Sequence, residues 1–140
     1  MATSSSVGYK GEASKAIDGE SNSGNFVDAV SGVCAHTNNG PSWITIDIGD
    51  TYTIDHMDFV GRRGCCHEQS SNWDIYVGNT GSASSDMRCT RNADVWGGDV
   101  ITVTCSSVLT GRYVTVTSDK WMVLCEIKVY GKIAESKGNV

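Results

Sequence analysis

The sequence predicts an all-β fold, for three reasons. Short runs of alternating or β-branched residues recur along the chain, and no segment repeats its apolar residues with the period of a helix. Turn residues separate these runs, at Gly49-Asp50, Gly78-Asn79, Gly97-Gly98 and Thr110-Gly111. At 140 residues the chain is large enough to bury one core. We therefore expect a single domain over residues 1–140, with two antiparallel sheets packed as a β-sandwich.

Six strands are evident, and they span residues 43–48, 54–60, 73–77, 100–105, 112–117 and 124–130. In the last strand, the alternation predicts that Cys125, Ile127 and Val129 share the inward face. Residues 1–39 are expected to be loop-rich, with one helical turn near residues 14–17. The core of the domain is expected at about residues 7–131, and residues 132–140 form a polar tail.

Charge and hydropathy exclude two classes of partner. The net charge is −5, and the lysines and arginines are scattered, whereas binding to nucleic acid needs a basic face that neutralises phosphates. No stretch approaches the roughly 20 apolar residues that a membrane span requires. Loop tips rich in glycine, serine and asparagine also argue against membrane insertion, although Trp96 and Trp121 are exceptions near the strand ends. We expect neither nucleic acid nor membrane insertion.

The six cysteines indicate an oxidising compartment, so the protein is expected to be secreted and extracellular. Cys65 and Cys66 are adjacent, and a disulfide between them would close a small ring because neighbouring α-carbons are only about 3.8 Å apart. Such a ring is a flat, weakly polar plate beside Arg62 and Arg63, and an apolar plate with fixed donors suits a sugar ring. The alternatives are that these cysteines pair elsewhere, or that Cys65-Cys66-His67 binds zinc with His36 or His56.

Seven segments together resemble the fucolectin, or F-type lectin, family. The resemblance runs from about Val7 to Gly131, and the adjacent cysteines with an upstream histidine separate this family from the wider discoidin-like, or coagulation factor C-type, domains. The segments are AIDG at 16–19, VCAH at 33–36, WITIDIG at 43–49, RRGCC at 62–66, NWDIYVG at 72–78, GRYV at 111–114 and LCEIKVYG at 124–131.

The resemblance implies an eight-stranded antiparallel jelly-roll sandwich with three disulfides. It selects one of the fifteen pairings that six cysteines allow. The implied pairs are Cys34 with Cys125, Cys65 with Cys66, and Cys89 with Cys105.

The resemblance also implies a sugar-binding site. In the family, a histidine, an arginine and a second basic residue after the cysteine pair hold the sugar, and these positions fall on His36, Arg62 and Gln69. Arg63 is the alternative to Arg62, and His67, with Glu68, is a further polar neighbour of the plate.

Two departures from the family predict an altered ligand preference. The aspartate before the cysteine pair is Gly64 here, and the second basic residue is Gln69. Glutamine can both donate and accept a hydrogen bond, so we expect a neutral hexose or small neutral glycan rather than strictly L-fucose. Because a hydrogen bond from a charged donor contributes more than one from a neutral donor, binding of fucose itself should be weaker.

The family commonly holds one structural calcium ion, and the resemblance implies such a site here. Asp18 and Glu126 match its carboxylate ligands. The remaining ligands would be backbone carbonyls, with Val33 where the family has a serine: Lys15, Glu20, Val33 and Cys125.

We expect binding rather than catalysis, because disulfide-bonded cysteines are not nucleophiles and the aspartates lie on strands and turns where solvated charge is usual. Weak single sites gain avidity in multiples, so a homo-oligomer is expected. The alternative function is that of a discoidin-type adhesion protein, or of a protein of an extracellular matrix, mineralised or not, that binds no sugar.

Overall fold

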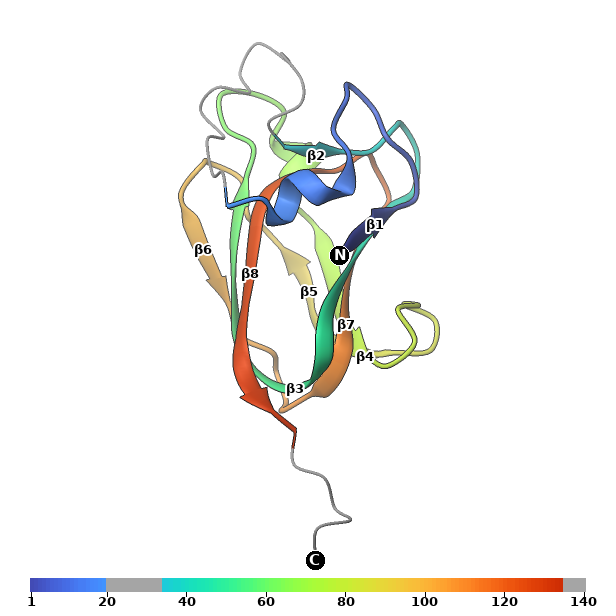
Figure 1. The fold of residues 1–140 in the computed structure, drawn as a ribbon. Helices are drawn as coiled ribbons and strands as arrows, with labels where there is room; N and C mark the ends of the chain where they lie inside the picture. Colours follow the sequence, from blue (N-terminus) through green and yellow to red (C-terminus); the bar gives the residue numbers. More distant parts are fainter. Residues whose placement is uncertain (20–33, 135–140) are drawn as a thin grey trace, which may run out of the picture.

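The computed structural model describes residues 1–19 and 34–134, in which antiparallel strands alternate with loops and two short 3-10 helices (Figure 1). The eight strands confirm the predicted all-β class. The elements follow in the order β1 (Ala2–Ser4), η1 (Ala13–Ile17), β2 (Ala35–His36), β3 (Ser42–Gly61), η3 (His67–Ser70), β4 (Trp73–Gly78), β5 (Met87–Ala93), β6 (Val100–Val103), β7 (Thr110–Ser118) and β8 (Val123–Ile133).

Strand β3 belongs to both layers of the sandwich. Its first part pairs with β1 and β7, and its second part pairs with β6 and β8. Strands β4 and β5 extend the first layer beyond β7, whereas β2 extends the second layer beyond β8. In Figure 1, β6 and β8 lie on the left, and β4, β5 and β7 lie on the right. The sequence predicted two separate strands here; instead, the register shifts between Asp47 and Tyr52, and Gly49 bends the strand at a φ of 91°.

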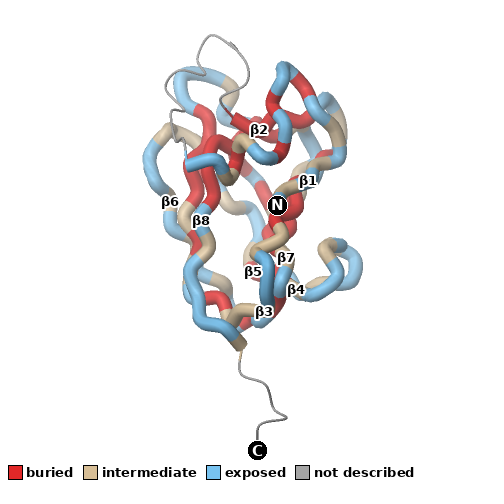
Figure 2. Tube along the Cα trace, viewed as in Figure 1, coloured by how far each residue is buried: buried red, intermediate tan, exposed pale blue. Residues whose placement is uncertain are grey.

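The core lies between the layers, where Figure 2 shows buried segments from both sheets. Strand β4 alternates as its sequence predicts, because Trp73, Ile75 and Val77 are fully buried and the residues between them are partly exposed. Ile101 and Val103 of β6 pack against the same core, although this strand ends at Val103 and not at Cys105 as predicted.

The predicted alternation of β8 fails at Cys125. The register shifts there, so that Val60 pairs with Glu126 but Gly61 pairs with Leu124, and Cys125 is the extra residue of a bulge. Leu124 and Ile127 consequently both reach the main core. Cys125 instead packs in a second cluster with Cys34, Val60 and Val123, so it does not share a face with Ile127 and Val129.

Both ends of the domain carry more strand than the sequence indicated. Strand β1 pairs with β3 from Ala2, before the expected start of the core, and β2 and β5 were not predicted. Lys132 and Ile133, which we assigned to the polar tail, pair with β3. The predicted helical turn near residues 14–17 is confirmed as η1. Residues 135–140 lie outside the described part of the chain.

The three predicted disulfides are present: Cys34 with Cys125, Cys65 with Cys66, and Cys89 with Cys105. The first joins β8 to the residue before β2, and the last joins β5 to the segment after β6. Within the described residues, no helix is long and apolar enough to cross a membrane.

Candidate functional site

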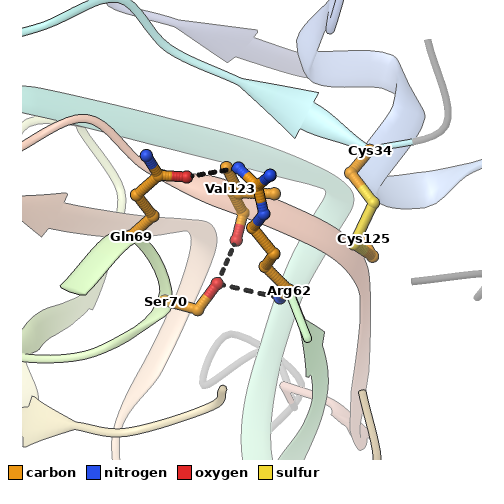
Figure 3. Close-up of a disulfide and its surroundings, with 6 residues drawn as sticks. All are labelled: Cys34, Arg62, Gln69, Ser70, Val123 and Cys125. Atoms are coloured by element: carbon orange, nitrogen blue, oxygen red, sulfur yellow. Dashed lines mark hydrogen bonds between the residues drawn. A yellow bond between two sulfur atoms is a disulfide. The ribbon is translucent and has the colours of Figure 1, made fainter. Parts of the chain in front are cut away.

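The candidate site lies where β3 ends and the segment 62–70 begins. Gly61 lets the end of β3 lie close to the loop after β5, because a Cβ atom at this position would collide with the carbonyl of Val95. The backbone N–H of Arg62 donates to Ser70 Oγ at 2.9 Å, and Ser70 Oγ donates to the carbonyl of Val123 at 2.7 Å (Figure 3). Both ends of the segment are therefore fixed to β8.

The side chains of Arg62 and Gln69 form a buried hydrogen-bonded pair. Arg62 Nη1 donates to Gln69 Oε1 at 2.7 Å, and each residue is only 5% exposed (Figure 3). Arginine can only donate, so the amide oxygen must face it, and the amide N–H group of Gln69 is directed elsewhere. Gln69 thus holds Arg62 in position.

Burial lowers the pKa of Arg62, and the neighbouring Glu68 and Tyr9 oppose this effect through their negative charge when ionised. Arginine keeps its proton in proteins even when buried. A fixed positive charge therefore lies at the base of the site.

The linked cysteines form the rim beside this pair. Gly64 has a φ of 91° and Cys66 a φ of 64°, so the chain turns sharply on both sides of Cys65. Cys65 is exposed and Cys66 is partly buried, and the carbonyl of Cys66 accepts a hydrogen bond from the N–H of Gln69 at 2.9 Å. The turn therefore places the disulfide on the surface, while the residue that holds Arg62 stays beneath it.

His36 reaches the site from β2. Its Nδ1 donates to the carbonyl of Thr37 at 2.7 Å, so the neutral ring carries its lone pair on Nε2. Burial lowers the pKa of His36, the bond to Thr37 opposes this, and the charge of Arg62 lowers it further. Burial and the charge of Arg62 thus both disfavour protonation of His36.

Two aromatic side chains that were not predicted for the site lie against His36. The ring of Tyr9 lies 4.7 Å from that of His36, and Trp121 meets the histidine edge-on at 5.8 Å. The sequence held no signal for Tyr9, since it lies in a segment that reads as loop. Trp121 was visible only as an aromatic residue near a strand end.

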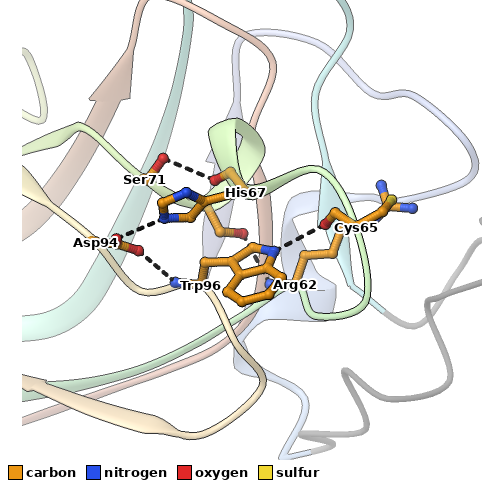
Figure 4. Close-up of polar contacts among 7 residues, drawn as sticks. Arg62, Cys65, His67, Ser71, Asp94 and Trp96 are labelled. Atoms are coloured by element: carbon orange, nitrogen blue, oxygen red, sulfur yellow. Dashed lines mark hydrogen bonds and ion pairs between the residues drawn. The ribbon is translucent and has the colours of Figure 1, made fainter.

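His67 and Arg63 lie further out. His67 Nε2 contacts Asp94 Oδ2 at 2.7 Å, and its carbonyl accepts a hydrogen bond from Ser71 Oγ (Figure 4). Arg63 is exposed, in contrast to the buried Arg62. The structure thus separates the two arginines by burial and brings His36, Arg62, Gln69 and the cysteine pair into one region.

The predicted calcium ligands are partly described. Glu126 is 5% exposed, and its Oε1 accepts a hydrogen bond from the N–H of Gly19 at 3.1 Å, which places the Asp18 loop beside β8. Lys15 is in η1, whereas Glu20 and Val33 lie outside the described residues. In residues 1–19 and 34–134, no three histidine, cysteine or acidic side chains gather as metal ligands.

Comparison with known proteins gives consistent matches. Residues 1–128 match the family model of the F5/8 type C domain. The chain is 34% identical over 119 residues to Fucolectin-5 of Anguilla japonica, a match that covers 81% of this chain and 61% of that protein. It is 30% identical over 123 residues to Fucolectin of Anguilla anguilla, covering 84% and 75% respectively. The chain thus spans less than two thirds of the length of Fucolectin-5.

Solved structures share the fold. A fucolectin from the serum of Morone saxatilis, the striped bass, superposes with a TM-score of 0.80 at 29% identity, over 94% of this chain and 46% of that one. The lectin domain of lectinolysin, solved with Lewis B antigen, superposes with a TM-score of 0.71 at 24% identity, over 94% and 92%.

Proposed function

Because the chain belongs to the F5/8 type C domain family and, within it, to the fucolectins or F-type lectins, we propose that it is a secreted protein that binds carbohydrate without catalysis. The sugar would rest on the Cys65–Cys66 plate, within reach of Arg62, His36 and Gln69. The similarity to serum and eel fucolectins supports this proposal.

The observation that carries the proposal is the bond between Arg62 and Gln69 beside the exposed disulfide. A guanidinium held by an internal acceptor loses no further freedom when a ligand binds, which favours recognition. Guanidinium N–H groups are donors suited to hydroxyl oxygens, and the plate suits the apolar face of a pyranose. Neutral His36 supplies acceptor chemistry on the other side.

The ligand class follows from Gln69. Its oxygen accepts from Arg62, so the amide group offers N–H donors toward the ligand but no second positive charge. The sequence alone suggested that Gln69 could both donate to and accept from a ligand; the structure leaves it the role of donor. We propose a neutral hexose or small neutral glycan as ligand, in preference to strictly L-fucose.

A glycan array tests the function, run before and after mild reduction. We expect signals on neutral glycans that weaken on reduction, because Cys65 is exposed whereas Cys34 and Cys125 are fully buried. A signal restricted to fucosylated glycans would overturn the proposed ligand class. No signal on any glycan would overturn carbohydrate binding and favour a discoidin-type adhesion or matrix role.

We also propose self-association in solution. A monosaccharide site with a dissociation constant of a few hundred micromolar contributes only about −5 kcal/mol, and linked sites multiply avidity without new contacts.

We also propose a structural calcium ion beside Asp18 and Glu126. Glu126 is a buried carboxylate, and a buried negative charge needs compensation from donors or a cation. It lies beside the Asp18–Gly19 segment, so an ion held by Asp18 and Glu126, with carbonyls of Lys15, Glu20, Val33 and Cys125, would fix this segment against β8. Its contribution would be structural, through the attachment of the Asp18–Gly19 segment to β8.

Calcium is therefore expected to raise the melting temperature by several degrees. A ligand at about 100 times its dissociation constant adds roughly 2.7 kcal/mol to the free energy of unfolding. Scanning calorimetry with calcium and with chelator measures the shift. Glu126→Gln keeps an oxygen for the Gly19 N–H but loses the charge, so its melting temperature should respond little to chelator. An unchanged wild-type melting temperature would refute the calcium site.

A further inference from the structure

Trp96 is a partly exposed tryptophan that does not belong to the main core. It lies in the loop between β5 and β6, and it is absent from the described side chains that form or pack against the main core. Its neighbour Val95, in contrast, is fully buried in that core. The indole of Trp96 therefore needs another explanation than packing.

The indole is held in one position by the candidate site. Trp96 Nε1 donates to the carbonyl of Cys65 at 2.9 Å, and the backbone N–H of Trp96 donates to Asp94 Oδ1 at 3.1 Å (Figure 4). The N–H of Gly97 donates to the carbonyl of Arg62 at 2.7 Å. Because the only polar atom of the side chain is already bonded, the exposed part of Trp96 is apolar ring.

His67 and Asp94 also contact Trp96. The imidazole of His67 meets the indole edge-on, with 5.4 Å between centroids and 68° between planes. Asp94 contacts both residues, through Oδ1 to the N–H of Trp96 and through Oδ2 to His67 Nε2 at 2.7 Å. Both side chains of that pair are more than half exposed, so they lie at the rim.

The indole and the disulfide are thus adjacent, because both are attached to Cys65. Its sulfur atom is part of the disulfide, and its carbonyl accepts the hydrogen bond from the indole. A flat apolar surface that is already ordered binds the face of a pyranose with little loss of freedom. One sugar on the plate leaves the indole beside it, and a second sugar joined to the first would lie over Trp96.

We propose that Trp96 forms a second sugar subsite next to the disulfide, so that the preferred ligand is an oligosaccharide of at least two units. This inference rests on the proposed carbohydrate-binding function. His67 and Asp94 are positioning residues for the indole. Covering one exposed indole face removes tens of Å² of apolar surface from water, which corresponds to roughly a tenfold gain in affinity.

The test compares wild type with Trp96→Ala on an array that carries galactose, glucose, mannose and fucose, each as a methyl glycoside and as the terminal unit of a disaccharide. Trp96→Ala is expected to weaken binding of the disaccharide about tenfold more than binding of the methyl glycoside, which contacts only the disulfide. Tyr130→Ala, which removes another exposed aromatic side chain, is the matched control and should change neither. Trp96→Phe, which keeps an aromatic ring, should recover part of the loss.

A second measurement does not depend on a truncated side chain. Of the four indole N–H resonances, the one missing in Trp96→Phe belongs to Trp96. We expect it to shift when the disaccharide binds wild type, and to shift little with the methyl glycoside. If glycans bind but Trp96→Ala weakens both forms equally, or neither, the subsite is wrong and the site at the disulfide stands. If no glycan binds wild type, the proposed function fails, and the subsite fails with it.

Discussion

Replacing Cys34 and Cys125 together with alanine is expected to lower the free energy of unfolding by about 4 to 5 kcal/mol. The bond joins residues 91 positions apart, and the chain-entropy model gives about this value for a loop of that length. Both cysteines are fully buried with Val60 and Val123, so the loss of the sulfur atoms also removes packing. Urea denaturation monitored by tryptophan fluorescence measures the change.

The matched control is the pair Cys89→Ala and Cys105→Ala. These residues are only 16 positions apart, and the same model predicts a loss of about 3 kcal/mol. If this variant is the less stable of the two, loop length is not what determines the contribution of these disulfides.

Arg62→Met is expected to abolish measurable glycan binding. A hydrogen bond from a charged donor contributes about 1.5 to 3 kcal/mol, which corresponds to a loss of roughly 10- to 150-fold in affinity. A site whose total is about −5 kcal/mol would then bind too weakly for detection by calorimetry. The variant also leaves the buried oxygen of Gln69 without its Arg62 donor, so its melting temperature must be recorded beside its affinity.

Arg63→Met makes the same chemical change at the adjacent, exposed arginine and should leave binding unchanged. Arg62→Lys separates charge from geometry, because lysine keeps the charge but lacks the planar fork of donors, and it should retain weak binding. Loss of binding in Arg63→Met with full binding in Arg62→Met would assign the role to Arg63, the alternative that the sequence left open.

The strands that sequence predicted best are those with one buried face. Strand β4 alternates between buried and partly exposed positions, and its pattern is visible without a structure. Strand β2 has two residues and β1 three, too few for any alternation. The bulge at Cys125 arises from pairing with β3, and residues far apart in sequence determine it.

The residues of the site could be predicted from the sequence, but the hydrogen bonds between them could not. The family resemblance indicated His36, Arg62, Gln69 and the cysteine pair, and the structure brings these residues into one region. The hydrogen bond between Arg62 and Gln69 depends on the left-handed backbone at Cys66, and no residue type in that segment predicts this conformation. The role of Trp96 likewise depends on a loop contact across 31 positions of sequence.

Because β3 belongs to both layers, the two layers are expected to unfold together. Since one continuous segment supplies hydrogen bonds to β7 on one side and to β8 on the other, neither layer can dissociate without breaking part of the ladder of its neighbour. Amide protons of both layers should therefore exchange with deuterium through the same global opening, and not as two independently fluctuating units.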